Sequence, residues 1–212
     1  MDKRFWAIVG VIIALFVGFV VLGRDDSNSS SSNAQPTSNV KGEGTTVTLV
    51  EYSDFQCPAC AQYYPIVEQV IDKYGDQIQF QYRHFPLRSI HPNAFAASRA
   101  SEAAAKQDKF WEMYDRLFAG QNDWSTAQNP NSIFETYAQQ IELDIEQYRT
   151  DFASREVNDA INADIRAGEE LGVNSTPTFF LNGEQLRPAP NSLEAFSELI
   201  DQALESDQAP QE

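Results

Sequence analysis

The order in which the hydrophobic periodicity changes along the chain is the strongest constraint on its fold. Residues 46–52 are rich in β-branched and aromatic side chains, and residues 78–85 alternate between apolar and polar, so both segments are predicted to be strands. Between them, residues 58–74 repeat apolar side chains at intervals of three and four, which is typical of a helix, and Gly75 would end it. A strand–helix–strand unit therefore opens the predicted domain.

A second group of elements completes the prediction. Residues from about 91 to 171 carry successive helical patterns and would form an insertion that ends at Gly172. The apolar run 178–181 then leads into Asn182-Gly183, a strong signal for a β-hairpin, with 184–187 as the returning strand. A last amphipathic helix would follow Ser192. This order favours an α/β fold in which helices cover a small mixed sheet.

The N-terminal segment predicts a membrane anchor. Residues 5–22 form an 18-residue run without a charged side chain, and Lys3 and Arg4 precede it. At about 1.5 Å per residue such a helix spans a bilayer core, and the basic flank is expected to stay in the cytoplasm. We therefore expect residues 1–23 to be a signal anchor that forms a single transmembrane helix. A cleaved signal peptide, cut near Gly23, is the alternative.

The composition changes after this apolar run. Residues 24–44 are rich in Ser and Asn and predict a flexible linker, and residues 206–212 predict a disordered tail. The domain would then span 45–205, outside the cytoplasm and tethered to the cell membrane.

The overall composition narrows the range of functions. The net charge is −16, which argues against nucleic acid as a ligand because a phosphate-binding surface needs an excess of Lys and Arg. The domain carries most of this acidity, which favours solubility. The chain has two cysteines, too few for a disulfide-stapled scaffold or a four-cysteine zinc site.

These two cysteines, in the sequence Cys57-Pro58-Ala59-Cys60, lie where the first strand gives way to the first helix. Unpaired N–H groups and the helix dipole at such an N-terminus favour negative charge, and Pro58 suits the first helical position. We expect Cys57 to be an exposed, acidified nucleophile. Cys60, one turn further, is expected to be buried and to act as the resolving thiol.

Two other readings of the pair are weaker. A structural disulfide across two residues would close too small a loop to restrict the unfolded chain. A zinc site would need two more ligands, and only His84 and His91 are available. A redox pair is favoured, since an extracytoplasmic location permits oxidation.

Four segments together resemble the DsbA-like thiol–disulfide oxidoreductases of the thioredoxin superfamily. They are Phe55-Gln56-Cys57-Pro58-Ala59-Cys60, Tyr82-Arg83-His84-Phe85-Pro86-Leu87, Lys109-Phe110-Trp111-Glu112-Met113 and the stretch from Gly172 to Gly183. The similarity spans residues 45–204. It implies a thioredoxin-like fold with a helical insertion, a membrane-anchored dithiol oxidase for exported proteins, and reoxidation by a quinone-linked membrane oxidase. No cofactor or metal is implied.

The resemblance also implies further site residues. Thr176-Pro177 would hold a cis proline facing the thiols, with the Thr176 backbone offered to a substrate strand. Glu51 would be a buried acid with a raised pKa that exchanges protons with Cys60, unless it lies outward at an edge. Asp54 could act in the same way, although turn positions commonly hold Asp for the turn itself.

One position departs from the family pattern. Strongly oxidising members often carry His where this chain has Ala59, which can neither donate a hydrogen bond nor hold charge. A less oxidising pair is therefore expected. Two rivals to the oxidase remain: a reductase or isomerase that uses the same residues, and a thioredoxin-fold binding module or chaperone in which the cysteines are structural.

Overall fold

A computed structural model describes residues 34–207 of the chain. The predicted anchor at 1–23, residues 24–33 of the predicted linker and residues 208–212 lie outside the described residues. Within 34–207, no helix is both long enough and apolar enough to cross a membrane.

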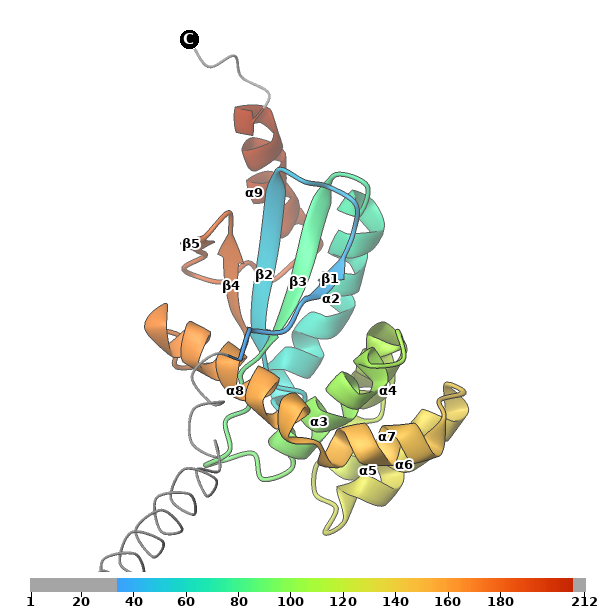
Figure 1. The fold of residues 1–212 in the computed structure, drawn as a ribbon. Helices are drawn as coiled ribbons and strands as arrows, with labels where there is room; N and C mark the ends of the chain where they lie inside the picture. Colours follow the sequence, from blue (N-terminus) through green and yellow to red (C-terminus); the bar gives the residue numbers. More distant parts are fainter. Residues whose placement is uncertain (1–33, 208–212) are drawn as a thin grey trace, which may run out of the picture. The chain divides into compact units, whose positions relative to one another are not determined.

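A five-stranded mixed sheet forms the centre of the domain (Figure 1). The spatial order of its strands is β1-β3-β2-β4-β5, in which β2 and β3 are parallel and all other neighbours are antiparallel. The strands are β1 Asn39–Lys41, β2 Val47–Ser53, β3 Ile78–His84, β4 Thr178–Leu181 and β5 Glu184–Gln185. The predicted hairpin is confirmed, although its second strand is shorter than expected.

Eight helices surround this sheet in the described part of the chain, and six of them lie between β3 and β4, as the predicted insertion does. The helices are α2 Pro58–Tyr74, α3 Ala94–Ala105, α4 Phe110–Ala119, α5 Gln121–Trp124, α6 Pro130–Gln140, α7 Ile145–Ala153, α8 Arg155–Glu170 and α9 Leu193–Asp207. Figure 1 shows α3 to α7 gathered beyond the end of the sheet from which β2 leads into α2. The insertion therefore stands beside the start of α2.

Alternation along β2 divides the core between the two faces of the sheet. Val47 and Leu49 belong to the main core, which also holds apolar residues of α2 and α9. Val50 and Tyr52 point to the other face, where they pack with Ile165 of α8. Gly168 permits this close approach, because a Cβ there would lie 2.9 Å from the Phe85 ring.

Local chemistry sets several element boundaries as predicted. Asn182 and Gly183 both have positive φ (49° and 83°), which is the conformation of a tight type I′ hairpin turn. Gly172, with φ of 78°, follows α8, and the Ser192 hydroxyl accepts a hydrogen bond from Ala195 N at 3.2 Å at the start of α9. Lys109, and not the neighbouring Asp108, is the N-cap residue of α4.

The predicted linker at 24–44 is wrong at its C-terminal end, because residues 39–41 form strand β1 on the edge of the sheet. Two residues of this segment are buried and form hydrogen bonds with side chains of the insertion. The Thr37 hydroxyl donates to Asp164 Oδ2 at 2.6 Å, and Asn39 Nδ2 donates to Glu102 Oε1 at 2.6 Å. The polar side chains that led to the prediction of a linker thus form hydrogen bonds with residues far away in the sequence.

The tail boundary also moves, since α9 extends to Asp207 and includes residues 206 and 207.

Candidate redox site

Two cysteines lie at the start of α2, as predicted. Cys57 is the N-cap, with extended φ and ψ of −69° and 123°, and Pro58 follows at the first helical position. The chain reaches this position through a turn in which Cys57 N donates to Asp54 O at 3.0 Å. Both cysteines are free thiols, so the structure shows the reduced pair.

The two sulfurs differ in environment, although less in exposure than expected. Cys60 is fully buried and Cys57 is 7% exposed, so the expectation of an exposed Cys57 is wrong. The reason is Thr176, whose carbonyl oxygen lies 3.4 Å from Cys57 Sγ. This oxygen lies against the sulfur, and a substrate must approach beside it.

Electrostatics separate the two thiols in the predicted direction. A hydrogen bond from the Cys60 thiol, assisted by Thr176 and by the backbone around Ala59 and Cys60, lowers the pKa of Cys57 to about 5 against the opposing effect of burial. Burial, together with the nearby Cys57 and Glu51, raises the pKa of Cys60 well above its ordinary value. Near neutral pH, Cys57 is therefore a thiolate and Cys60 a thiol.

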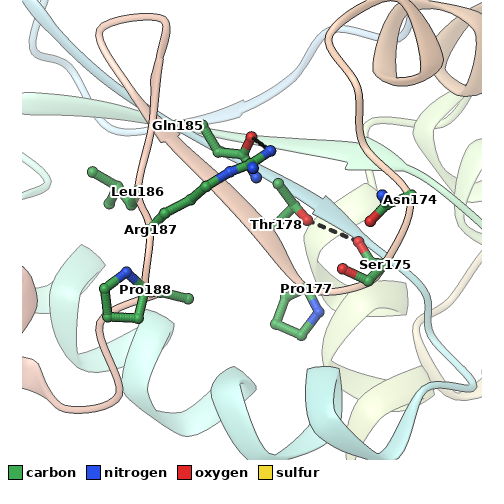
Figure 2. Close-up of a pocket in the computed structure, with 9 residues that line it drawn as sticks. Asn174, Ser175, Pro177, Thr178, Gln185, Leu186, Arg187 and Pro188 are labelled. Carbon is green, nitrogen blue, oxygen red and sulfur yellow. Dashed lines mark hydrogen bonds between the residues drawn. The ribbon is translucent and has the colours of Figure 1, made fainter.

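A cis peptide bond joins Thr176 to Pro177, as the resemblance implied. A second cis bond, between Arg187 and Pro188, had no sequence signal beyond the proline itself. Figure 2 shows a groove with Pro177, at the start of β4, on one side and Pro188, in the segment after β5, on the other.

This groove has a volume of about 310 Å³ and is mostly polar, apart from its prolines and Leu186 and Ala189. Within it, Thr178 Oγ1 donates to Ser175 O at 2.8 Å, and the Arg187 guanidinium donates to Gln185 Oε1 (Figure 2). The lining residues are Asn174, Ser175, Pro177, Thr178, Gln185, Leu186, Arg187, Pro188 and Ala189. Pro177, which lines the groove, directly follows Thr176, whose carbonyl oxygen lies 3.4 Å from Cys57 Sγ. The sequence analysis did not identify the side of the groove that residues 185–189 form.

Glu51 points into the core, on the side of the sheet that packs against α2. Glu51 is only 2% exposed. This burial raises the pKa of Glu51 to about 7, and Ser53 makes a smaller contribution that lowers it. The edge orientation considered above does not occur. Glu51 also contributes to the raised pKa of Cys60, so its carboxylate is electrically coupled to the buried thiol.

Asp54 has a structural place in the turn before Cys57, as its position in a turn suggested. Its buried carboxylate accepts hydrogen bonds from Gln56 N at 2.7 Å and from Leu87 N at 2.8 Å, and His91 Nδ1 lies 2.7 Å from it. Two residues of the segment between β3 and α3 thereby help to fix the turn that presents Cys57.

Gln121 was missed by sequence reasoning. Its Nε2 atom donates to Phe55 O at 2.7 Å and to Cys57 O at 3.1 Å, which ties the insertion to the turn. No local pattern marks a glutamine for such a bond across 64 residues.

The histidines do not gather with the cysteines into a metal site. His84 Nε2 lies 2.8 Å from Glu102 Oε1, whereas His91 bonds to Asp54. Among residues 34–207, no group of three or more His, Cys, Asp or Glu side chains could hold a metal ion.

A thioredoxin-like core, a helical insertion and a thiol pair beside a cis proline define the class of this protein. A family profile described as thioredoxin matches residues 35–202, and the chain belongs to this family.

Solved structures agree with this assignment, and the fold is similar to that of DsbA-like proteins. A thioredoxin-like oxidoreductase from Silicibacter pomeroyi is 25% identical, with a TM-score of 0.68 over 87% of this chain and 100% of its own. BdbD from Bacillus subtilis is 21% identical, with a TM-score of 0.69 over 81% and 97%. The alpha-DsbA1 protein of Wolbachia pipientis is 19% identical, with a TM-score of 0.70 over 84% and 97%. At the lower identities, the likeness concerns the fold.

Curated relatives share a segment with this chain rather than its full length. A Na(+)/H(+) antiporter NhaA 3 of Salinispora tropica is 38% identical over 160 residues, which are 76% of this chain and 24% of the antiporter. An NhaA 1 of Mycolicibacterium gilvum is 41% identical over 145 residues, or 66% and 22%. The chain thus spans less than a quarter of the length of these relatives.

Proposed function

We propose that the protein is an extracytoplasmic dithiol oxidase that introduces disulfides into exported proteins through Cys57 and Cys60. The observation that carries this proposal is the contrast within the pair, in which the pKa of Cys57 is lowered to about 5 and that of Cys60 is raised. A stabilised Cys57 thiolate is a good leaving group and favours the reduced state of the pair, which makes the disulfide form an oxidant.

The reaction starts from the Cys57–Cys60 disulfide. A substrate thiolate attacks Cys57 Sγ, the bond between the two cysteines breaks, and Cys60 leaves as a thiolate that takes up a proton. The second substrate thiolate then attacks the substrate sulfur of the mixed disulfide, and Cys57 leaves as a thiolate. The substrate loses two electrons, the pair gains them, and no cofactor is needed.

The site supports binding of a substrate strand beside Thr176. The Thr176 carbonyl oxygen lies 3.4 Å from Cys57 Sγ in the reduced state. It can accept a hydrogen bond from a backbone N–H of an extended substrate segment. The groove beyond Pro177 offers room for side chains next to the substrate cysteine.

Location and partners extend the same proposal. Residues 5–22 would anchor the protein in the cell membrane by one helix, with the domain outside the cytoplasm, and a quinone-linked membrane oxidase would restore the disulfide. Support comes from the uncharged 18-residue run that follows Lys3 and Arg4 and from the DsbA-like neighbours.

The decisive experiment adds the oxidised full-length protein to a reduced multi-cysteine substrate and follows disulfide formation. The wild type should oxidise the substrate, Cys60→Ala should accumulate mixed disulfides through Cys57, and Cys57→Ser should be inactive. A binding module or chaperone would instead assist folding equally well as Cys57→Ser, and that result would refute the proposal.

The redox potential separates the oxidase from a reductase or isomerase. Equilibration with a glutathione buffer should give a potential above that of the glutathione pool but below that of DsbA-like proteins with His at the position of Ala59. The reason is that one lost contact worth about 1.4 kcal/mol shifts a two-electron potential by about 30 mV. A value as high as in those proteins would contradict the role given to Ala59.

A further inference from the structure

One charged residue, Arg187, lines the groove beside Pro177. The other lining residues are either polar and uncharged or apolar. The chain as a whole has 31 acidic and 15 basic residues, so its overall electrostatic field repels anions. Arg187 therefore gives the groove a charge opposite to that of the protein around it.

The position of Arg187 follows from the register of the hairpin that β4 and β5 form. Pairing continues one step beyond β5, where Leu186 N donates to Phe179 O at 2.9 Å. In the same antiparallel register, the next residue, Arg187, comes opposite Thr178 of β4. Among the described residues, no backbone hydrogen bond joins these two positions, so the two segments separate here and the groove lies between them.

The guanidinium of Arg187 is held on one wall of the groove without being neutralised. It donates to Gln185 Oε1, as Figure 2 shows, and Gln185 also lines the groove. Glu184 adjoins Gln185 and therefore points to the opposite face, because side chains alternate along a strand. Within residues 34–207, Arg187 forms no salt bridge. A guanidinium has five N–H donors, so its bond to Gln185 leaves others for a ligand.

The opposite wall of the groove adds groups that suit a carboxylate. Asn174 and Ser175 line this wall, and the side-chain amide of Asn174 has two N–H donors. The Thr178 hydroxyl donates to Ser175 O at 2.8 Å, which fixes the segment before β4. With a guanidinium on one side, an amide on the other and no acid in its lining, the groove favours an anionic side chain over a cationic one.

The groove lies within reach of a substrate bound at the thiols. Thr176 O lies 3.4 Å from Cys57 Sγ, and Thr178, which comes opposite Arg187, is two residues further along the chain. Two residues of extended chain cover about 7 Å. Because β5 already pairs with the next part of β4, an extended substrate that begins beside Thr176 passes into the groove and towards Arg187.

We propose that Arg187 makes this groove selective for acidic substrates. Its guanidinium binds an Asp or Glu side chain that lies two or three residues from the substrate cysteine that attacks Cys57. This inference rests on the proposed function and narrows it to exported segments with a carboxylate near the reacting cysteine. Arg187 acts on the choice of substrate and takes no part in the thiol–disulfide exchange itself.

Two electrostatic effects act on such a substrate in opposite directions. The net charge of −16 repels an acidic peptide at long range. A carboxylate bound to a guanidinium forms charge-assisted and often paired hydrogen bonds, which act only at contact. A preference for acidic peptides is therefore specific evidence for contact with Arg187, because the overall charge predicts the reverse.

The test compares the rates at which the oxidised full-length protein oxidises dithiol peptides. The peptides differ at one position, which is moved through the three residues on either side of the first cysteine and holds Asp, Asn or Lys. Wild type is compared with Arg187→Gln and Arg187→Glu. Arg155→Gln is the matched control, because it removes one positive charge at the start of α8, about 22 Å along that helix from its end at Glu170. Circular dichroism verifies that each variant folds.

The measured quantity is the ratio of the second-order rate constants for the Asp and Asn peptides. Comparing this ratio between proteins cancels the effect of Asp on the peptide's own thiols and any change in the reactivity of the thiol pair. At one or two positions, the ratio should be about fivefold higher in wild type than in Arg187→Gln, the upper end for an exposed ion pair. This difference should shrink at about 0.5 M salt. Arg187→Glu should oxidise the Lys peptide faster than the Asp peptide, and Arg155→Gln should keep the wild-type ratio.

An Asp-to-Asn ratio that is the same in wild type and Arg187→Gln at every position would overturn the inference. An equal fall of the ratio in Arg155→Gln would overturn it as well, because that result assigns the preference to the total charge of the protein. Both outcomes leave the proposed function standing if every peptide is oxidised through Cys57. A wild-type protein that oxidises none of the peptides would contradict the proposed function, and the inference would fall with it.

Discussion

Each cysteine of the pair owes its character to a different neighbour. Cys57 receives a hydrogen bond from Cys60 and faces the Thr176 carbonyl, whereas Cys60 lies in the core beside Glu51. The CPAC spacing and its place at a helix start predicted this division. The burial of Cys57 was not predictable, because it depends on a segment 119 residues further along the chain.

The titration of Cys57 tests the hydrogen bond that it receives from Cys60. Thiolate absorbance of the reduced protein should rise with a midpoint near pH 5. Cys60→Ala removes the main donor, so the midpoint should move upward by about one unit or more. Cys57→Ser is the control and should show no thiolate in this range; an unmoved midpoint in Cys60→Ala would assign the low pKa to the helix start alone.

Glu51 predicts a pH dependence of stability in the oxidised protein, where the cysteines do not titrate. Its pKa is raised from 4.5 to about 7 by folding, so the folded state holds a proton that the unfolded state has lost. Stability from this residue is complete below pH 4.5, falls as pH rises and reaches its minimum above 7. The loss should be on the order of 3 kcal/mol.

Urea unfolding at pH 5 and pH 8 measures this loss. Glu51→Gln should abolish it, while the exposed Glu198→Gln should preserve it. Equal pH dependence in wild type and Glu51→Gln would show that burial does not hold this carboxyl protonated.

At the scale of secondary-structure elements, the edge strand β1 and helix α8 depend on one buried carboxylate. Asp164 has no exposed surface, and its oxygens bond to Thr37 N and Oγ1, to His84 N and to the Arg83 guanidinium. It therefore joins β1's leading segment, β3 and α8. The neighbouring pair between Asn39 and Glu102 makes a second junction of the same kind.

Replacing Asp164 with Ala should destabilise the protein by about 3–5 kcal/mol, because Arg83 and two backbone N–H groups lose their partner inside the fold. Chemical unfolding measures the effect. Asp159→Ala, which removes a surface pair with Arg155 on the same helix, should cost about 0.5 kcal/mol or less. Similar losses in both variants would contradict the structural role of Asp164.

Most elements could be predicted from the sequence because their signals are local. The Asn182-Gly183 turn, Pro58 at the start of α2 and the helical periodicities act over a few residues. Strand β1 could not be predicted, since its partners lie far away in the chain. One signal was nevertheless present: Asp164 falls on the same stripe of α8 as Val157 and Ile161, which marks it as a buried acid that needs partners.

The residues of the candidate site were predictable from the sequence only where their signals were local or came from the resemblance. Pro177 and Glu51 were accessible through the resemblance and through their spacing from Cys57. Glu102 and Gln121 were not, because an acid in an Ala-rich helix and a polar residue near a helix start are both ordinary surface features in sequence. Only the tertiary contacts distinguish them.

For the whole molecule, the boundary of the folded unit is a testable matter. A chain beginning at Gln35 should unfold at about the same denaturant concentration as the full chain. One beginning at Thr45, the boundary expected from composition, lacks β1 and leaves Asp164 and Glu102 short of partners. It should lose about 2 kcal/mol or more. Equal stability of the two truncated chains would show that β1 adds nothing.

The proposed anchoring is tested on the same scale. In fractionated cells, the full chain should remain with membranes after high-salt washing, and the chain beginning at Gln35, fused to a cleaved export signal, should be recovered in the soluble extracytoplasmic fraction. Recovery of the full chain in that fraction would favour a cleaved signal peptide.

The antiparallel pairing of β1 has a consequence for reach. Because Asn39 pairs with Tyr82 near the end of β3, the chain enters the folded unit at the same end of the sheet as Cys57. If residues 5–22 lie in a bilayer as proposed, the 14 residues 23–36 can span no more than about 50 Å even when fully stretched. The thiols would then stay within a short distance of the membrane surface. At that distance they could react both with exported chains that emerge from the membrane and with a membrane-bound oxidant.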